Sequence, residues 1–111
     1  MFRVLVTEKI SSTGLEYLRD AGYEVDVQIG LDEAELIEAI KSAHAVIIRS
    51  ATSITKQVIS DAGELVVIGR AGIGLDNVDV AAATEQGIMV VNAPKSNILS
   101  AAEHTVALLL A

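Results

Sequence analysis

The sequence has no cysteine and a single proline, and its only aromatic residues are Phe2, Tyr17 and Tyr23. A chain without cysteine forms neither disulfides nor thiolate metal sites. Basic residues are also scarce, because 8 Lys and Arg stand against 15 Asp and Glu, for a formal net charge of −7. Nucleic acids are bound largely through basic side chains, so we do not expect this acidic chain to bind DNA or RNA.

Long hydrophobic runs are absent as well. No stretch approaches the roughly 20 apolar residues that span a membrane, and the first apolar run is too short for a signal peptide. We therefore expect a soluble, cytoplasmic protein with no membrane partner. What the sequence does contain is 51% apolar residues in a chain of 111, enough for one domain with a core of Val, Ile, Leu and Ala.

Short apolar runs alternate with helix-like segments along the chain. The five runs of strand length cover residues 4–6, 23–27, 45–48, 65–68 and 88–91. Helical patterns separate them at residues 12–20, after Asp32, after Thr55 and at residues 78–85, and a last helix begins between Ser96 and Ser100. This alternation is typical of a parallel sheet with right-handed crossovers. We predict an α/β fold, with a five-stranded parallel sheet and helices on both faces in three layers.

Capping signals support these helices. Asp32 is followed three residues later by Glu35, the pattern of a capping box. Thr55 is expected to cap the third helix, and Gly22 and Gly87 are expected to end the first and the fourth.

Basic side chains gather at the expected carboxyl ends of the strands, the edge at which parallel sheets bind ligands. Half of the basic residues fall there, and only Glu8 and Asp76 lie among them. They are Lys9, Arg49, Arg70 and Lys95. Because arginine holds a carboxylate or phosphate with two parallel hydrogen bonds, this edge predicts a site for a small anion. The alternative is that strand ends expose polar residues in any sheet and that some are basic by chance.

A glycine-rich segment follows the fourth apolar run. Gly69, Gly72 and Gly74 read G-x-x-G-x-G, the reverse of the dinucleotide-binding order, so they do not specify a pyrophosphate site. We interpret them as main chain that comes close to a ligand, with the N–H groups of Gly72 and Ile73 as donors. The alternative is a turn that needs a positive φ.

Signals for catalysis and for metal binding are missing from the sequence. His44 and His104 have no second ligand at metal-binding spacing, and no serine lies in a nucleophile-elbow motif. No pair of residues is arranged for acid–base chemistry. We therefore predict no metal site and no catalytic residue within this chain.

Several motifs in register resemble one enzyme family. They are residues 49–52 (Arg-Ser-Ala-Thr), residues 67–79 around the glycines, residues 91–94 (Val-Asn-Ala-Pro) and residues 96–103. Together they resemble the N-terminal part of the D-2-hydroxyacid dehydrogenase family, in the branch that acts on 3-phosphoglycerate. The resemblance runs from Val4 to Ala111. It implies a flavodoxin-like substrate-binding domain that closes over a separate NAD-binding Rossmann domain.

The resemblance also implies roles for individual residues. Arg49 and Ser50 would hold the anionic groups of the substrate. Arg70, with the main chain of Ala71 and Gly72, would face the substrate carboxylate. Ile73 would lie at the nicotinamide end of NAD. Asn97 would add a polar contact to the substrate where the last helix begins.

The implied activity is NAD-linked oxidation of 3-phosphoglycerate to 3-phosphohydroxypyruvate, the entry step of serine biosynthesis. The sequence has no forward G-x-G-x-x-G, and it ends within an apolar helical segment at residues 106–111. We therefore expect residues 1–111 to be a single substrate-binding domain, truncated before the Rossmann domain. Alone it should be catalytically inactive and should not bind NAD. Its expected partners are the small anionic substrate, the missing Rossmann domain and a second copy through the exposed C-terminal helix.

Two alternatives remain open from the sequence. The first keeps the family but changes the substrate to another 2-hydroxy acid. The second is a stand-alone flavodoxin-like module that binds a small anion. A phosphorylation receiver is disfavoured because Arg49 stands where a carboxylate is needed, and a flavodoxin is disfavoured because both tyrosines lie far from the expected binding loops.

Overall fold

Strands and helices alternate without exception in the computed structural model of the chain, which describes residues 2–9, 12–71 and 76–93. The five strands are β1 (Arg3–Val6), β2 (Glu24–Val27), β3 (Ala45–Ile48), β4 (Val67–Ala71) and β5 (Met89–Ala93). The four helices are α1 (Ser12–Asp20), α2 (Glu33–Ile40), α3 (Lys56–Ser60) and α4 (Val80–Glu85). All strand pairs are parallel, and the order across the sheet is β2-β1-β3-β4-β5. This is the order of flavodoxin-like folds.

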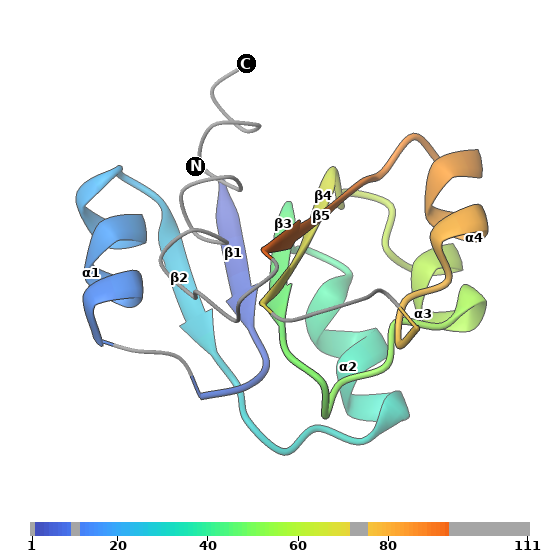
Figure 1. The fold of residues 1–111 in the computed structure, drawn as a ribbon, viewed down its shortest axis with the longest axis horizontal. Helices are drawn as coiled ribbons and strands as arrows, with labels where there is room; N and C mark the ends of the chain where they lie inside the picture. Colours follow the sequence, from blue (N-terminus) through green and yellow to red (C-terminus); the bar gives the residue numbers. More distant parts are fainter. Residues whose placement is uncertain (1, 10–11, 72–75, 94–111) are drawn as a thin grey trace.

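The helices cover both faces of the sheet (Figure 1). Helix α1 packs on one face beside β1 and β2, and helices α2, α3 and α4 pack on the other. The predicted α/β class, with a five-stranded parallel sheet in three layers, is therefore confirmed. The strands run in the same direction, toward the lower part of the view, so the described loops after β1, β2 and β3 lie at the same end of the sheet.

Two apolar clusters form the core, one on each face of the sheet. Strand β3, at the centre of the sheet, is buried at every residue. The larger cluster joins the sheet to α2, α3 and α4 through Leu5, Leu36, Ile40, Val46, Ile48, Ile54, Val58, Ile59, Ile68 and Val78. The smaller joins it to α1 through Val4, Val6, Leu18, Tyr23, Ala45, Ile47 and Val67. Burying each large aliphatic side chain contributes about 1.5–3 kcal/mol, so these clusters dominate the stability of the fold.

The predicted caps are present. The Asp32 carboxylate accepts from the Glu35 N–H at 2.8 Å, and Glu35 Oε1 accepts from the Asp32 N–H at 3.1 Å. Thr55 Oγ1 accepts from the Val58 N–H and caps α3. Gly22 follows α1 and Gly87 follows α4, and both have positive φ values, which glycine adopts without strain.

Three elements have bounds that differ from the sequence-based prediction by two or more residues. Strand β5 covers residues 89–93 instead of 88–91, because Asn92 and Ala93 still pair with Arg70 and Ala71 of β4. Strand β4 covers residues 67–71 instead of 65–68, because Gly69 and Arg70 pair with β3 on one side and with β5 on the other. These two residues, expected in a loop, are therefore part of the sheet. Helix α4 begins at Val80 instead of Val78, because Val78 forms a parallel bridge with Ile54. The last predicted helix, and with it the predicted dimer contact, lies outside the described residues.

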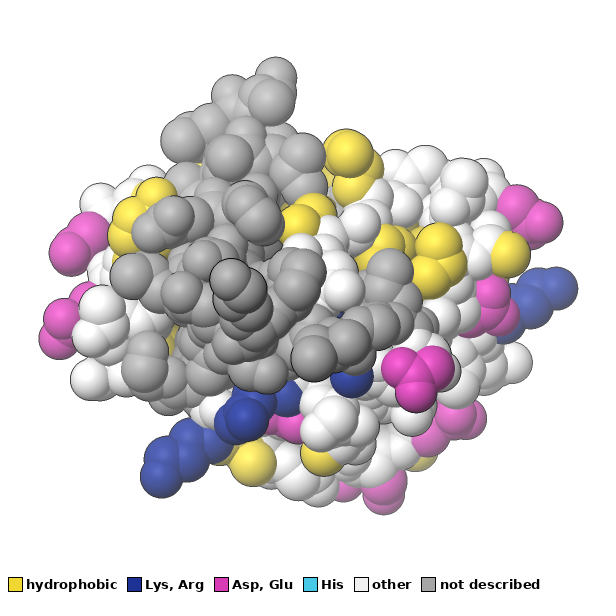
Figure 2. Space-filling view, viewed as in Figure 1, with side chains coloured by type: hydrophobic (Ala, Val, Ile, Leu, Met, Phe, Trp, Pro, Cys, Tyr) yellow, Lys and Arg dark blue, Asp and Glu magenta, His cyan; other side chains and the backbone are white. Residues whose placement is uncertain are grey.

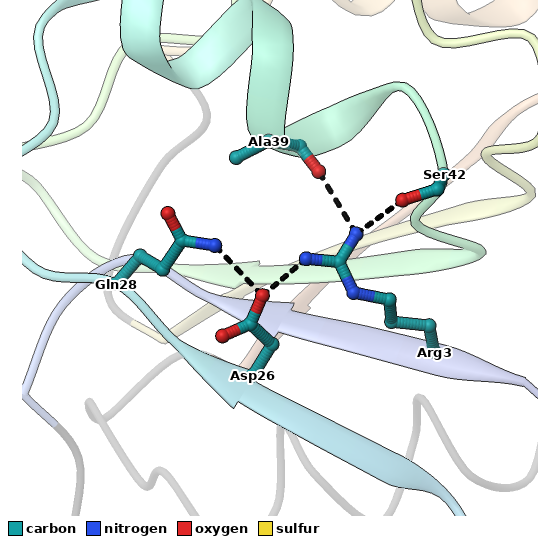
Figure 3. Close-up of polar contacts among 5 residues, drawn as sticks. All are labelled: Arg3, Asp26, Gln28, Ala39 and Ser42. Atoms are coloured by element: carbon teal, nitrogen blue, oxygen red, sulfur yellow. Dashed lines mark hydrogen bonds and ion pairs between the residues drawn. The ribbon is translucent and has the colours of Figure 1, made fainter.

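A polar cluster fastens α2 to the edge of the sheet (Figure 3). The Arg3 guanidinium reaches the Asp26 carboxylate on β2, the Ala39 carbonyl at 3.1 Å and the Ser42 hydroxyl. The Gln28 side-chain amide also donates to Asp26, at 2.7 Å. The hydrogen bond from Gln28, followed by the one from Arg3, holds the pKa of the Asp26 carboxyl below its usual value, because both stabilise the charged form.

Candidate functional site

The sheet order reverses between β1 and β3, and in open α/β sheets ligands bind at such a point, beyond the carboxyl ends of the strands. A pocket of about 350 Å³ lies there. Its walls come from the loops after β1, β2 and β3, and its lining residues are Thr7, Glu8, Lys9, Ile29, Gly30, Leu31, Arg49, Ala51 and Thr52. The lining thus combines apolar side chains with charged or hydroxyl-bearing ones.

Residues 49–52, which we call the Arg49 loop, are held by the loop after β1. The Glu8 carboxylate accepts hydrogen bonds from three main-chain N–H groups of this loop. The donors are Arg49, Ala51 at 3.0 Å and Thr52 at 3.2 Å. The Thr7 and Thr52 hydroxyls lie 2.9 Å apart, which adds a fourth hydrogen bond between the two loops. Converging main-chain N–H groups bind anions, and here the anion is a side chain of the protein itself.

The Arg49 loop is held from its other side by Asn77. Asn77 Nδ2 donates to the carbonyl of Arg49 at 2.7 Å and to the carbonyl of Thr52 at 2.6 Å. Asn77 Oδ1 accepts from Nε of Arg70, which is 6% exposed. One amide side chain therefore ties the Arg70 guanidinium to the main chain that carries Arg49.

Main-chain pairing places Asn77 at this position. The Ile54 N–H donates to the Asn77 carbonyl at 2.8 Å, and the Asp79 N–H donates to the Ile54 carbonyl at 2.9 Å. This short parallel pairing fixes residues 77–79 beside the segment that follows the Arg49 loop. A second pocket, of about 380 Å³, lies along it, between residues 53–56 and residues 76–79.

The structure brings the two predicted arginines to one edge of the sheet, in different environments. Arg49 is exposed, and its guanidinium donates to the Lys9 carbonyl at 3.3 Å. Arg70 is buried, in register with Ile48 and Asn92. Ser50 is exposed in the Arg49 loop, and Ala71 is the last residue of β4.

The remaining predicted site residues, Gly72, Ile73 and Asn97, lie outside the described residues. Lys95, the fourth basic residue of the predicted anion site, does so as well. In the space-filling view, basic side chains lie at the lower left, and acidic side chains occupy other parts of the lower edge (Figure 2). Of the four basic residues predicted at this edge, the structure describes Lys9, Arg49 and Arg70, and their role in an anion site stays a prediction.

Sequence reasoning missed Glu8 and Asn77 as parts of this site. Glu8 was noted only as an acid among basic residues, and Asn77 was given no role of its own within residues 67–79. The available signal was position, because Glu8 follows β1 and so faces the loop after β3 across the point where the sheet order reverses. Within the described ranges, no group of three or more His, Cys, Asp or Glu side chains is placed to hold a metal ion.

Comparison with known proteins assigns the family. The family model described as D-isomer specific 2-hydroxyacid dehydrogenase, catalytic domain, matches residues 4–107. The chain belongs to this family. The resemblance read from its motifs is therefore confirmed.

Among 2-hydroxyacid dehydrogenases, the chain is similar to several curated D-3-phosphoglycerate dehydrogenases over its whole length. It is 46% identical to the enzyme of Synechocystis sp. and 49% identical to that of Methanocaldococcus jannaschii, each over 111 residues. These alignments cover 100% of this chain but only 20% and 21% of the two relatives. The chain thus spans about a fifth of the length of the curated relatives it matches.

Solved 2-hydroxyacid dehydrogenases share the fold. The NAD⁺-bound 3-phosphoglycerate dehydrogenase of Entamoeba histolytica superposes with a TM-score of 0.75 at 30% identity, over 82% of this chain and 32% of that one. The NADPH-dependent glyoxylate/hydroxypyruvate reductase of Sinorhizobium meliloti gives 0.67 at 25% identity, over 83% and 28%. Across the part of the chain that the structure describes, no helix combines the length and the apolar character needed to cross a membrane.

Proposed function

We propose that the full-length protein is an NAD-dependent dehydrogenase that oxidises 3-phosphoglycerate to 3-phosphohydroxypyruvate, and that this chain supplies part of its substrate site. The observation that carries the proposal is the Arg49 loop, which presents an exposed guanidinium at the carboxyl edge and is tied through Asn77 to Arg70. The curated relatives named D-3-phosphoglycerate dehydrogenase, which match this chain from end to end, support the choice of substrate.

The part played by this chain is to bind and orient the substrate. Arg49 presents a planar set of donors to a carboxylate or phosphate, and Ser50, the next residue in the chain, is also exposed. Holding the anionic groups fixes the hydroxyl-bearing carbon in place, which lowers the entropic part of the barrier for hydride transfer. NAD accepts the hydride in such enzymes, and the proton acceptor would come from elsewhere in the full-length protein.

The described residues of this chain support a site for a small anion rather than for a dinucleotide. The pocket at the reversal of strand order is about 350 Å³, near the lower end of the range for small-molecule sites, and its polar groups suit one small anion. We therefore propose that a Rossmann domain of the full-length protein binds NAD. The isolated chain should show no NAD-dependent turnover.

The proposal extends to the cellular location. NAD and 3-phosphoglycerate are both highly charged and cross lipid bilayers poorly, so the enzyme should share their compartment, the cytoplasm. A fluorescent fusion of the full-length protein tests this part separately.

The decisive experiment compares substrates on the full-length enzyme. Initial rates of NADH formation are measured with 3-phosphoglycerate and with glycerate, which lacks the phosphate. We expect kcat/KM to be at least about 100-fold higher for 3-phosphoglycerate, because a charge-assisted hydrogen bond to phosphate contributes roughly 1.5–3 kcal/mol and several act together. Equal values would reject the phosphorylated substrate.

Another 2-hydroxy acid is the second candidate. It is favoured by the likeness to the Sinorhizobium meliloti glyoxylate/hydroxypyruvate reductase. The same assay, run in the reducing direction with glyoxylate and hydroxypyruvate, distinguishes the two candidates by which substrate gives the higher kcat/KM.

A further inference from the structure

Glu8 is an acid at the edge where the proposed function, on which this inference rests, requires an anion to bind. A carboxylate there should repel the substrate unless its charge serves another group. In the structure the carboxylate is turned toward the main chain, and its oxygens accept hydrogen bonds from the N–H groups of Arg49, Ala51 and Thr52. We propose that Glu8 is a positioning residue, whose carboxylate holds the main chain of the Arg49 loop so that the Arg49 guanidinium stays presented to the substrate.

The division of contacts supports this role. Within the described ranges, no ion pair joins Glu8 to Arg49. The guanidinium instead makes one long hydrogen bond, to the Lys9 carbonyl at 3.3 Å. Glu8 therefore stabilises the main chain under Arg49 without neutralising its side chain, and the positive charge remains at the edge of the sheet.

The Glu8 carboxylate also provides hydrogen-bond acceptors for main-chain N–H groups of the Arg49 loop, as helices and strands do for their own residues. Residues 50–52 belong to no helix or strand, so their N–H groups need partners from side chains or water. Glu8 satisfies N–H groups while Asn77 satisfies carbonyls of the same loop, at 2.7 Å and 2.6 Å. A loop held from both sides is ordered before the substrate arrives, which reduces the entropy lost on binding.

The Glu8→Gln substitution isolates this function. Glutamine has nearly the same shape, but one of its two terminal atoms is a donor, so it cannot accept from every N–H group that the carboxylate serves. Glu8→Asp keeps the charge and both acceptors on a shorter side chain, and serves as the conservative variant. Glu85→Gln removes one negative charge from an exposed position at the end of α4, on the opposite edge of the sheet, and is the matched control.

Two measurements on the full-length enzyme test the proposal. The first is hydrogen–deuterium exchange of the peptide that covers residues 49–52, without substrate. We expect exchange at least about 10-fold faster in Glu8→Gln, because its N–H groups lose their charged acceptor. The second is steady-state kinetics with 3-phosphoglycerate, in which we expect KM to rise about 5- to 20-fold while kcat changes less than about 2-fold, as for loss of an interaction made equally in ground and transition states.

Each outcome decides for or against the role. Intermediate KM and exchange values in Glu8→Asp, with wild-type values in Glu85→Gln, support positioning. Unchanged exchange in Glu8→Gln overturns the proposal, and so does faster exchange with an unchanged KM. A KM that falls in Glu8→Gln also overturns it, because it would mean that Glu8 competes with the substrate. A thermal unfolding scan confirms that the variants are folded. If the wild type oxidises a different 2-hydroxy acid, the proposed substrate is wrong, while Glu8 is judged by the same measurements with that acid.

Discussion

Asp26 shows how a single ionisable group makes the fold depend on pH. Its carboxyl pKa is lowered in the folded chain by hydrogen bonds from Gln28 and Arg3. The unfolded chain therefore binds more protons at acidic pH, and the stabilisation is fully present above the ordinary pKa and lost as the pH falls through the folded pKa. We predict that the free energy of unfolding in urea decreases more steeply between about pH 5 and pH 2 in the wild type than in Asp26→Asn.

The same substitution measures what the cluster contributes near neutral pH. Removing the charge breaks the ion pair with Arg3, so Asp26→Asn should lower the free energy of unfolding at pH 7 by about 1 kcal/mol, as expected for a pair that is partly exposed. Asp20→Asn removes the same charge from an exposed site at the end of α1 and is the control. A parallel pH dependence in wild type and Asp26→Asn would contradict the assignment to Asp26.

Ile47 tests the packing of the smaller core cluster. It lies on the central strand, between Val6 and Gly69 in register, and is fully buried on the face that α1 covers. Ile47→Ala should lower the free energy of unfolding by about 2–5 kcal/mol, because it leaves a cavity, and Ile47→Val by about 0.5–1.5 kcal/mol. Urea denaturation measures both losses of free energy, provided that the m-values of the variants equal that of the wild type. Similar losses for the two variants would mean that the core closes over the space.

Single residues also show what the sequence can and cannot predict about the site. Arg49 and Arg70 were named from the sequence, because basic side chains at strand ends point to an anion without further information, and their role in a substrate site stays a prediction. Glu8 and Asn77 were not, because each acts through main-chain atoms of a loop about 25 to 44 positions away along the chain, and nothing in the local pattern identifies that loop as the partner. The contacts of Glu8 and Asn77 depend on where the folded sheet places them.

At the level of elements, the capping box of α2 links local sequence to tertiary structure. Asp32 and Glu35 satisfy each other's main-chain N–H groups, and the far end of this helix supplies the Ala39 carbonyl to Arg3. Asp32→Ala should lower the free energy of unfolding by about 1 kcal/mol, whereas Asp32→Ser, which can still cap, should be nearly neutral. Urea unfolding followed by circular dichroism compares them. Equal losses would show that the charge near the helix N-terminus matters more than the cap.

Elements whose signals are local were predicted well, and elements set by their partners were not. Helix α2 has its own cap and apolar stripe, and β3 is a short run of buried aliphatic residues, so both begin where the sequence indicated. Strand β4 continues through Gly69 and Arg70 because two neighbouring strands pair with them, against the intrinsic preference of glycine. The start of α4 is delayed by pairing to Ile54, which no pattern in residues 76–80 reveals.

At the scale of the whole molecule, the proposed function requires the chain to attract an anion although its net charge is −7. The basic side chains at the carboxyl edge can attract an anion to an acidic chain only if the position of each positive charge matters more than the total net charge. The substitutions Arg49→Gln and Arg19→Gln distinguish the effect of a charge's position from the effect of the total charge, because each removes one positive charge. Arg49→Gln removes it from the proposed substrate edge, and Arg19→Gln removes it from the last turn of α1, at the opposite edge.

We predict that Arg49→Gln raises KM for 3-phosphoglycerate in the full-length enzyme about 10- to 100-fold, the range given by a lost charge-assisted hydrogen bond, and that Arg19→Gln changes it less than about 2-fold. Steady-state kinetics at low and high salt measure both effects. Because contact at the edge is short-range, the Arg49 effect should persist when salt is raised to about 0.5 M, whereas any Arg19 effect should vanish with screening. Equal effects of the two substitutions, both abolished by salt, would show that total charge controls binding and would remove Arg49 from the substrate site.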